Sequence, residues 1–378
     1  MFVKRFQIFR AFGIPIYVDL SWFVVALLIS WSLADNVFPN SLPGRSVSSY
    51  WTLGISATLG LFVSIILHEL AHALVARRFS VPIRGITLFI FGGVAEMAEE
   101  PPSARAEFLV AVAGPIASIG VAASCFGLAA FLAGTPPAST VLGFLAGLNL
   151  ILVAFNMIPA FPLDGGRVLR SLLWHLRKDL RWATRITSWI GSAFGMVLIA
   201  LGLYRALFGG DLIGGLWSFM IGVFLRNAAQ MSYRHVVIRK ALEGEPVSRF
   251  MITHPITVPR AIPISDLVQN YVYKHHFKMF PVVEGGNLLG CVTTRAIKQI
   301  PQAEWERQSV GAILETCSPN NTITPGADAM HALARMSQSN VSRLMVVESG
   351  QLVGILALKD LLKFLSLKVE LEGGNGAG

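Results

Sequence analysis

Long apolar runs, separated by short polar segments, fill the first 235 residues of the chain. Each run is close to the roughly 20 residues that an α-helix needs to cross the hydrocarbon core of a bilayer. The pattern therefore predicts about six membrane-spanning helices. They fall near residues 17–34, 51–76, 106–133, 139–159, 184–208 and 212–231.

The pattern changes after about residue 240, where apolar runs of this length stop. The remaining sequence is typical of a soluble α/β fold. The chain is therefore predicted to be a polytopic α-helical membrane protein followed by a soluble α/β part. We expect the membrane domain over residues 1–235 and a linker over residues 236–248.

The segment 84–99 does not fit the helical pattern. Its sequence ITLFIFGGVAEM is apolar and β-forming, yet it is too short to span as a helix. The pair Gly92–Gly93 favours a tight turn. We expect a re-entrant strand or hairpin whose exposed edge pairs with an extended peptide. A loop lying at the membrane surface is the alternative.

Composition agrees with an integral membrane protein, since 53% of the 378 residues are hydrophobic, 14% are charged and the mean hydropathy is +0.59. The net charge of +9 raises nucleic-acid binding as a possibility. Lys and Arg, however, cluster at 4–10, 77–84, 167–185 and 226–240, on alternate loops. The positive-inside rule predicts this placement for a cell-membrane protein with cytoplasmic N- and C-termini. We therefore expect a lipid bilayer and no nucleic acid as a partner.

The second apolar run contains three ionisable side chains within five residues, His68, Glu69 and His72. On a helix, positions i and i+4 share a face, so both imidazoles can reach one metal ion while Glu69 holds a water molecule. Each ionisable group costs about 2.5–3.5 kcal/mol at the bilayer centre, whereas zinc binding contributes about 10–16 kcal/mol. A metal therefore offsets the cost of burial. A pair of histidines hydrogen-bonded in a bundle core is the alternative.

A third ligand is needed, because catalytic zinc usually has three protein ligands and one water. The candidate is Asp164, which follows a very apolar stretch in the fourth run. Pro159 and Pro162 should break the helix here, so that Asp164 faces the bundle interior from unwound backbone. The alternative is a helix N-cap at the membrane surface. The second and fourth runs cross in the same direction, and each motif falls just before a basic exit, so both motifs are predicted at one depth near the cytoplasmic face.

Asn156 lies eight residues before Asp164 in the same apolar run. Its amide can donate to a developing oxyanion or orient a substrate, and an interhelical hydrogen bond is an equal alternative. For Asn149 we favour the interhelical hydrogen bond.

These motifs resemble the site-2 protease family of intramembrane zinc metalloproteases. The resemblance covers residues 1 to about 235 and rests on HELAH at 68–72 and NMIPAFPLDGG at 156–166, with Gly92–Gly93 and AGP at 113–115 as further elements. It implies one zinc ion per chain, with Glu69 as general base and acid and Asn156 as an assisting group. The implied zinc ligands are His68, His72 and Asp164.

The resemblance also implies an activity. It is the hydrolysis of a peptide bond in or near the transmembrane segment of a single-span membrane protein, as in regulated intramembrane proteolysis. A membrane transporter or channel with a regulatory tail is the main alternative, because intramembrane ionisable residues also mark ion pathways. A catalytically silent membrane scaffold is a second alternative.

Residues 249–366 contain an internal repeat. FPVVEGGNLLGCVTTRAI at 280–297 matches LMVVESGQLVGILALKDL at 344–361, an offset of 64 residues. Two similar packed units follow from such a repeat. The pattern resembles a tandem of cystathionine β-synthase (CBS) domains, expected at 249–309 and 310–368 and followed by a disordered tail, 369–378.

The CBS family often binds adenine nucleotides through a Thr or Ser followed three residues later by an Asp. The first copy keeps Thr293 but has Ala296, and the second keeps Asp360 but has Ala357. Thr293 and Asp360 are therefore the candidate nucleotide-binding residues, each in an incomplete half-site. The alternative roles are homodimerisation and substrate contact. We expect the pair to lie in the cytoplasm and to regulate access or activity.

Overall fold

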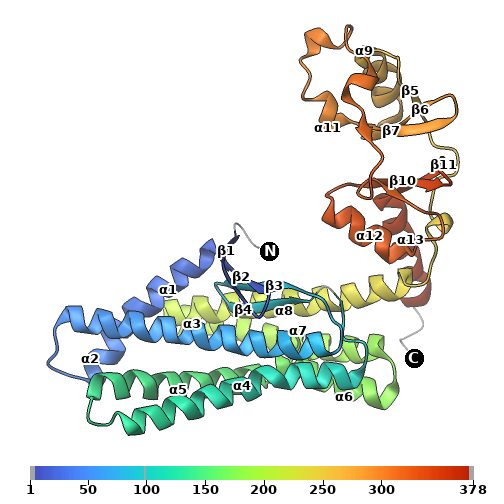
Figure 1. Cartoon of the computed structure of the whole chain (residues 1–378). Helices are drawn as coiled ribbons and strands as arrows, with labels where there is room; N and C mark the ends of the chain where they lie inside the picture. The colour runs from blue at the N-terminus through green and yellow to red at the C-terminus, as the bar shows by residue number, and fades with distance from the viewer. Residues whose placement is uncertain (1–4, 98, 374–378) are drawn as a thin grey trace. The chain divides into compact units, whose positions relative to one another are not determined.

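The chain forms two compact units, Met1–Val236 and Val237–Gly378, in a computed structural model that describes residues 5–97 and 99–373, with side chains up to residue 368. Long helices and one small sheet make up the first unit (Figure 1). Two small sheets with short helices make up the second.

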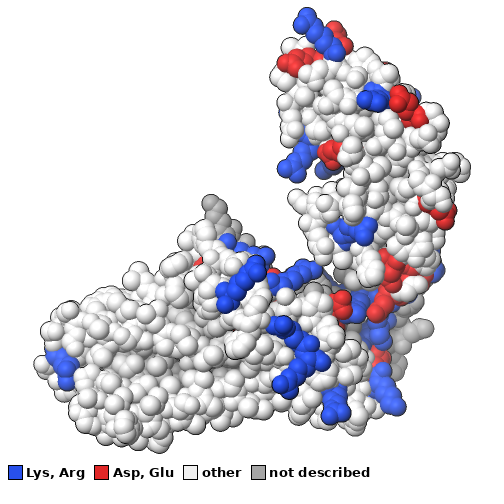
Figure 2. Space-filling model, viewed as in Figure 1, with Lys and Arg blue, Asp and Glu red and all other residues white. Residues whose placement is uncertain are grey.

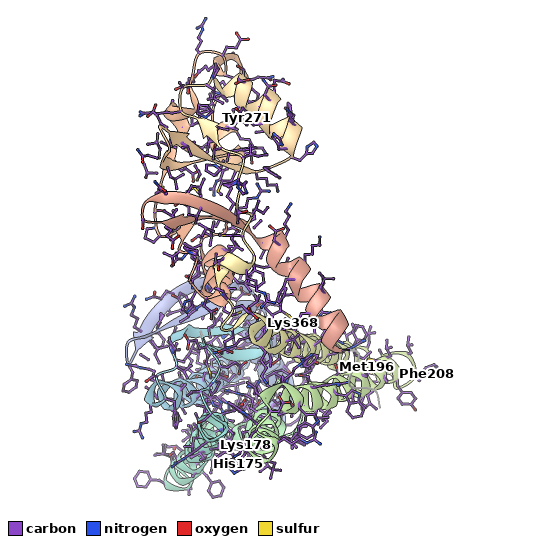
Figure 3. All side chains as sticks on the ribbon, turned by 90° about the vertical axis from the view of Figure 1, so that its right-hand side faces the viewer. His175, Lys178, Met196, Phe208, Tyr271 and Lys368 are labelled. Atoms are coloured by element: carbon purple, nitrogen blue, oxygen red, sulfur yellow. The ribbon has the colours of Figure 1, made fainter. Side chains whose placement is uncertain are left out.

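Six helices of the described chain are long and apolar enough to cross a membrane, which confirms the predicted spans. Their outer surfaces are strongly apolar, with Phe126, Trp189 and Ile213 70%, 71% and 82% exposed. Figure 3 shows Phe208 projecting in the same way from the end of α7. Soluble proteins rarely expose so much apolar surface, so lipid is the solvent for these faces. The first of the six consists of α1 (Leu20–Ser32), η1 (Leu33–Val37) and α2 (Phe38–Ser41), and the others are α3 (Val47–Arg78), α4 (Ala104–Phe131), α5 (Pro136–Asn156), α7 (Leu180–Leu207) and α8 (Leu212–Leu242). The shorter α6 (Asp164–Arg177) lies between α5 and α7 in the sequence and is not one of the six.

Local signals explain where the central helix α3 begins and ends. The Ser46 hydroxyl accepts a hydrogen bond from the Ser49 N–H and caps its first turn. Arg77 and Arg78 occupy its last turn, where cations interact favourably with the helix dipole.

On the face shown in Figure 2, Lys and Arg gather toward one end of the helical unit, and most of the remaining surface is uncharged.

Four strands form the sheet of the first unit, in the order β1-β2-β3-β4. The β3–β4 hairpin corresponds to the hairpin predicted within residues 84–99, and Gly92 follows its turn with a φ of +122°, a conformation that favours glycine. Strand β4 is at the edge of the sheet and packs against α3. The strands are β1 (Arg5–Ala11), β2 (Ile14–Asp19), β3 (Ile83–Phe89) and β4 (Gly92–Met97).

The second unit shows the predicted repeat. The hairpins β6–β7 and β10–β11 have the same antiparallel pairing, with a register shift at Val282/Val283 in one and at Val346/Val347 in the other. The sheets are β5-β6-β7-β8, formed by Val258–Pro259, Met279–Glu284, Asn287–Thr293 and Glu315–Thr316, and β11-β10-β9, formed by Gln351–Ala357, Arg343–Glu348 and Thr322–Ile323. The helical segments are η2 (Val247–Arg249), α9 (Ile264–Asp266), η3 (Leu267–Val272), α10 (Tyr273–His275), α11 (Thr294–Ile297), η4 (Gln302–Glu304), η5 (Val310–Ile313), α12 (Ala329–Gln338) and α13 (Leu358–Gly373).

The segment 236–248 is not the linker that the sequence suggested. Helix α8 continues to Leu242, and Leu242 and Val247 are fully buried in a core that also contains Leu344 and Leu356. The apolar side chains of Leu242 and Val247 are therefore part of the core of the second CBS repeat.

The two repeats also exchange their first segments. Val310 packs in the core of the first repeat, and β8 pairs with β7 there. Val247 packs in the core of the second repeat, where Ile252 pairs with Ile355. The predicted boundary between residues 309 and 310 therefore does not separate the two folded repeats, because each repeat contains a segment from the other side of it.

The tail predicted to be disordered from residue 369 is helical over its first five residues, because α13 continues to Gly373. The stretch VELE at 369–372 consists mainly of good helix formers, so the helix persists until the glycines. Residues 374–378 lie outside the described part of the chain.

Candidate metal centre

His68, Glu69 and His72 lie in the C-terminal third of α3. The two histidines are buried and lie one turn apart on the same face, with 3.2 Å between their Nε2 atoms. A helix of this length holds the imidazole pair in one arrangement, because its backbone is fixed by hydrogen bonds on both sides of the motif.

Asp164 approaches the histidines from a different part of the fold. The chain leaves the helical conformation after α5, passes through residues 157–163 and resumes as a helix at Asp164. Its buried Oδ2 lies 3.1 Å from His68 Nε2 and 3.2 Å from His72 Nε2. Asp164 is the first residue of α6, and Leu163 occupies the N-cap position. The carboxylate therefore faces the two imidazoles and does not cap the helix.

The three atoms fit the requirements of a divalent metal. A tetrahedral zinc site with bonds of 2.0–2.1 Å needs ligand atoms about 3.3 Å apart, which is close to the separations found here. Helix α4 packs closely against them at Gly114, where an added Cβ would contact His72 Nε2 and lie 2.7 Å from His68 Nε2, so only glycine leaves the two ligand nitrogens in place. The donor set and its spacing match a bound zinc ion.

Helix α4 also orients both imidazoles. His72 Nδ1 lies 2.6 Å from the carbonyl oxygen of Val110, which only accepts hydrogen bonds, so Nδ1 carries the proton and Nε2 keeps its lone pair. His68 Nδ1 lies 3.0 Å from the hydroxyl of Ser118. Such outer partners fix the ring orientation of metal-binding histidines. Neither partner was predicted from the sequence, in which the one available signal is that Ser118 lies one helical turn after Gly114.

Glu69 contacts the hairpin. Its Oε2 accepts a hydrogen bond of 3.0 Å from the backbone N–H of Ala95 in β4. A Cβ added to Gly93 would lie 2.8 Å from Glu69 Cγ, so the strand approaches this side chain closely only because residue 93 is glycine. The edge strand and the candidate general base are thus in direct contact.

A cavity of about 580 Å³ connects these groups. His68, Glu69, His72, Asp164 and Asn156 line it, together with mostly apolar side chains of β3, β4, α5 and α8. A few convergent polar groups on apolar walls are typical of a site that binds an apolar substrate and directs chemistry at one point.

The two asparagines of α5 have separate roles. Asn156 lies at the end of the helix and faces the cavity. Asn149 is fully buried and donates hydrogen bonds to the hydroxyl of Ser64 at 3.0 Å and to the carbonyl oxygen of Leu145 at 2.9 Å. It joins α5 to α3, as the interhelical interpretation expected.

The CBS candidates Thr293 and Asp360 have different surroundings. The Thr293 hydroxyl accepts a hydrogen bond from the Ala296 N–H and donates one to Glu315 at 2.9 Å, which caps α11. Asp360 lies in the first turn of α13. Burial lowers the pKa of the Arg343 guanidinium, and the negative charge of Asp360 opposes this shift.

Comparison with known families and proteins gives consistent matches. The model of peptidase family M50 matches residues 56–141 and 135–201, and the CBS-domain model matches residues 247–301 and 310–367. Two relatives named zinc metalloproteases are Rip3 of Mycobacterium tuberculosis, 34% identical over 95% of this chain and 92% of the relative, and sll0528 of Synechocystis, 32% identical over 94% and 93%. Among solved structures, a site-2 protease from Methanocaldococcus jannaschii is 29% identical, with a TM-score of 0.44, covering 61% of this chain and 96% of that one.

Proposed function

Because this chain belongs to peptidase family M50, and is a zinc metalloprotease of the site-2 protease type with tandem CBS domains, we propose that it hydrolyses a peptide bond in or near a transmembrane segment of a single-span membrane protein. The observation that carries this proposal is the group of His68, His72 and Asp164, whose ligand atoms lie 3.1–3.2 Å apart within an integral membrane unit. Peptidase relatives do not favour the transporter alternative.

One zinc ion per chain would be held by His68 Nε2, His72 Nε2 and Asp164 Oδ2. When bound, zinc lowers the pKa of a water molecule and polarises the scissile carbonyl. Val110 and Ser118 keep the two imidazoles in the required orientation through their Nδ1 atoms.

Glu69 would move the protons. Its carboxylate takes a proton from the attacking water and passes it to the leaving amine. The hydrogen bond from the Ala95 N–H holds one carboxylate oxygen in place. The amide of Asn156, which faces the same cavity, would donate to the substrate carbonyl oxygen and orient the peptide.

Strand β4 would present the substrate. The carbonyl groups of a transmembrane helix are already hydrogen-bonded, so the substrate must unwind locally before cleavage. An unwound segment can add to the exposed edge of a sheet, and β4 is such an edge, lining the cavity beside Glu69. The hairpin would take a re-entrant position, in which the surrounding protein and the cavity shield its non-helical backbone from lipid.

Both termini and the CBS pair would lie in the cytoplasm. The basic clusters follow the positive-inside rule in this orientation, and the site then lies near the cytoplasmic face, where water reaches it by a short path. The CBS pair would regulate access or activity, by binding an adenine nucleotide at Thr293 and Asp360 or by forming a homodimer.

Purified protein tests this function directly. Zinc content is measured alongside cleavage of a single-span membrane protein reconstituted in the same vesicles. We expect one zinc per chain in the wild type, loss of zinc and cleavage in Asp164→Ala, and recovery of chelator-treated wild type when zinc is added back. His175→Ala, which changes an exposed histidine of α6 (Figure 3), is the matched control and should behave as wild type. Ion flux that survives chelation, with no cleavage, would favour the transporter alternative.

A further inference from the structure

A buried group of charges joins α4 to α6 beside the candidate metal centre. Arg170 lies six residues after Asp164 on α6 and is 2% exposed, and Glu107 in the first turn of α4 is 0% exposed. Arg170 Nε donates to Glu107 Oε1 at 2.6 Å, and its Nη2 forms a second ion pair with the same oxygen. Nη2 also donates to Glu100 Oε2 at 2.9 Å.

Stability alone is a poor reason for this arrangement. Removing two charges from water is costly, and apolar residues of similar volume often replace a buried ion pair without loss of stability. A buried pair is better suited to selecting one geometry, because its hydrogen bonds are directional while apolar packing is not.

This ion pair joins the two helices, α4 and α6, that hold groups of the metal centre. Helix α4 carries Val110 and Ser118, the partners of the two histidines, and α6 begins at Asp164. The Arg170 guanidinium also lies 5.0 Å from the ring centre of Phe161, in the turn that leads into Asp164. Arg170 is thus in contact with both the helix that orients the imidazoles and the turn that presents the carboxylate.

We infer that Arg170, held by Glu107 and Glu100, is a positioning residue that fixes Asp164 relative to the His68–His72 pair and thereby sets the affinity of the site for zinc. This inference rests on the proposed ligand set. Arg170 acts through Asp164, and its role requires no contact with the substrate.

The test measures zinc affinity in the full-length protein by competition with a chelator, together with the temperature of unfolding. Arg170→Met should bind zinc about tenfold to 100-fold more weakly, in line with losses of outer partners at metal sites. Because Arg170→Met leaves the buried Glu107 with only the longer ion pair to Arg167, at 4.0 Å, the double variant Glu107→Leu/Arg170→Met is also needed. It should regain an unfolding temperature near that of the wild type yet keep the weak zinc binding.

Arg205→Met is the matched control, since Arg205 pairs with Asp211 at 2.6 Å in an exposed position, 54% exposed, at the end of α7. Its zinc affinity should equal that of the wild type.

The outcomes separate the two claims. Wild-type zinc affinity in both the single and the double variant would show that packing alone positions Asp164, and would overturn this inference while the ligand set stands. A wild-type protein that binds no zinc would instead overturn the ligand set, and this inference with it.

Discussion

In the first unit, residues from α3 and α6 that lie more than 90 positions apart bring three ligand atoms within 3.2 Å of one another. In the second unit, Thr293 and Asp360 belong to two copies of one repeat, and each copy has alanine at the position where the resemblance implies a second polar residue. A buried polar group without partners is costly in a membrane, so every polar group of the metal centre needs a partner. The CBS fold rests on its apolar cores, which do not require complete polar half-sites.

This contrast predicts sharp effects at the metal centre and mild effects at the CBS pair. The largest effect is expected for Glu69→Gln, which removes the proton acceptor but retains the shape of the side chain. Cleavage should fall by about 10²–10⁴-fold, while zinc content stays at the wild-type level because Glu69 is not among the proposed ligands. Cleavage at the wild-type rate would remove Glu69 from the mechanism.

Gly114→Ala should be nearly as damaging, although it adds one methyl group. The new Cβ would contact the ligand nitrogen of His72 and lie 2.7 Å from that of His68, so both imidazoles would have to move away from their metal-binding positions. A misplacement of this size costs about 100-fold in activity. Gly120→Ala on the same helix is the control, because a Cβ there meets nothing within 4 Å. Equal cleavage by both variants would show that the close packing of Gly114 against the two histidines does not matter for activity.

Ser118→Ala tests the orientation of His68. Loss of the hydroxyl that lies 3.0 Å from Nδ1 should weaken zinc binding by about tenfold, measured by chelator competition, with little change in unfolding temperature. Ser124→Ala removes a hydroxyl from an exposed part of α4, where it bonds only to the Gly120 carbonyl among the described partners, and should leave zinc affinity unchanged. A similar loss in both variants would point to a general effect on α4.

The smallest effects are expected at Thr293→Ala and Asp360→Ala. Without nucleotide, cleavage should change by less than about twofold, as is usual for substitutions outside a tightly packed core. With ATP or AMP in excess, the wild type should gain in unfolding temperature and the variants should gain less, because a ligand stabilises the folded state in proportion to its affinity. Thr253→Ala, at an exposed position, is the control. No gain in the wild type with either nucleotide would rule out the nucleotide proposal.

Local pattern accounts for much of what was predicted. Run length alone identified the six spans, since bilayer thickness sets helix length. The i, i+4 spacing of His68 and His72 places both on one face of any helix, whatever surrounds it. Asp164 could be joined to them from the sequence because two spans crossing in the same direction, each with a basic exit, put both motifs at one depth.

Other features depended on which surfaces pack together, and no local pattern carries that information. The partners of the histidines come from α4, 38 and 50 residues away, and the Arg170–Glu107 pair spans 63 residues. The linker prediction failed for the same reason, since the apolar residues of 236–248 join a core whose other members lie about 100 positions later. Periodicity and spacing along the chain determined the helices and the metal-binding motif. Only the tertiary structure decided which distant polar groups contact the histidines and the helix of Asp164. The physical reason is that these contacts depend on packing and desolvation across the whole unit.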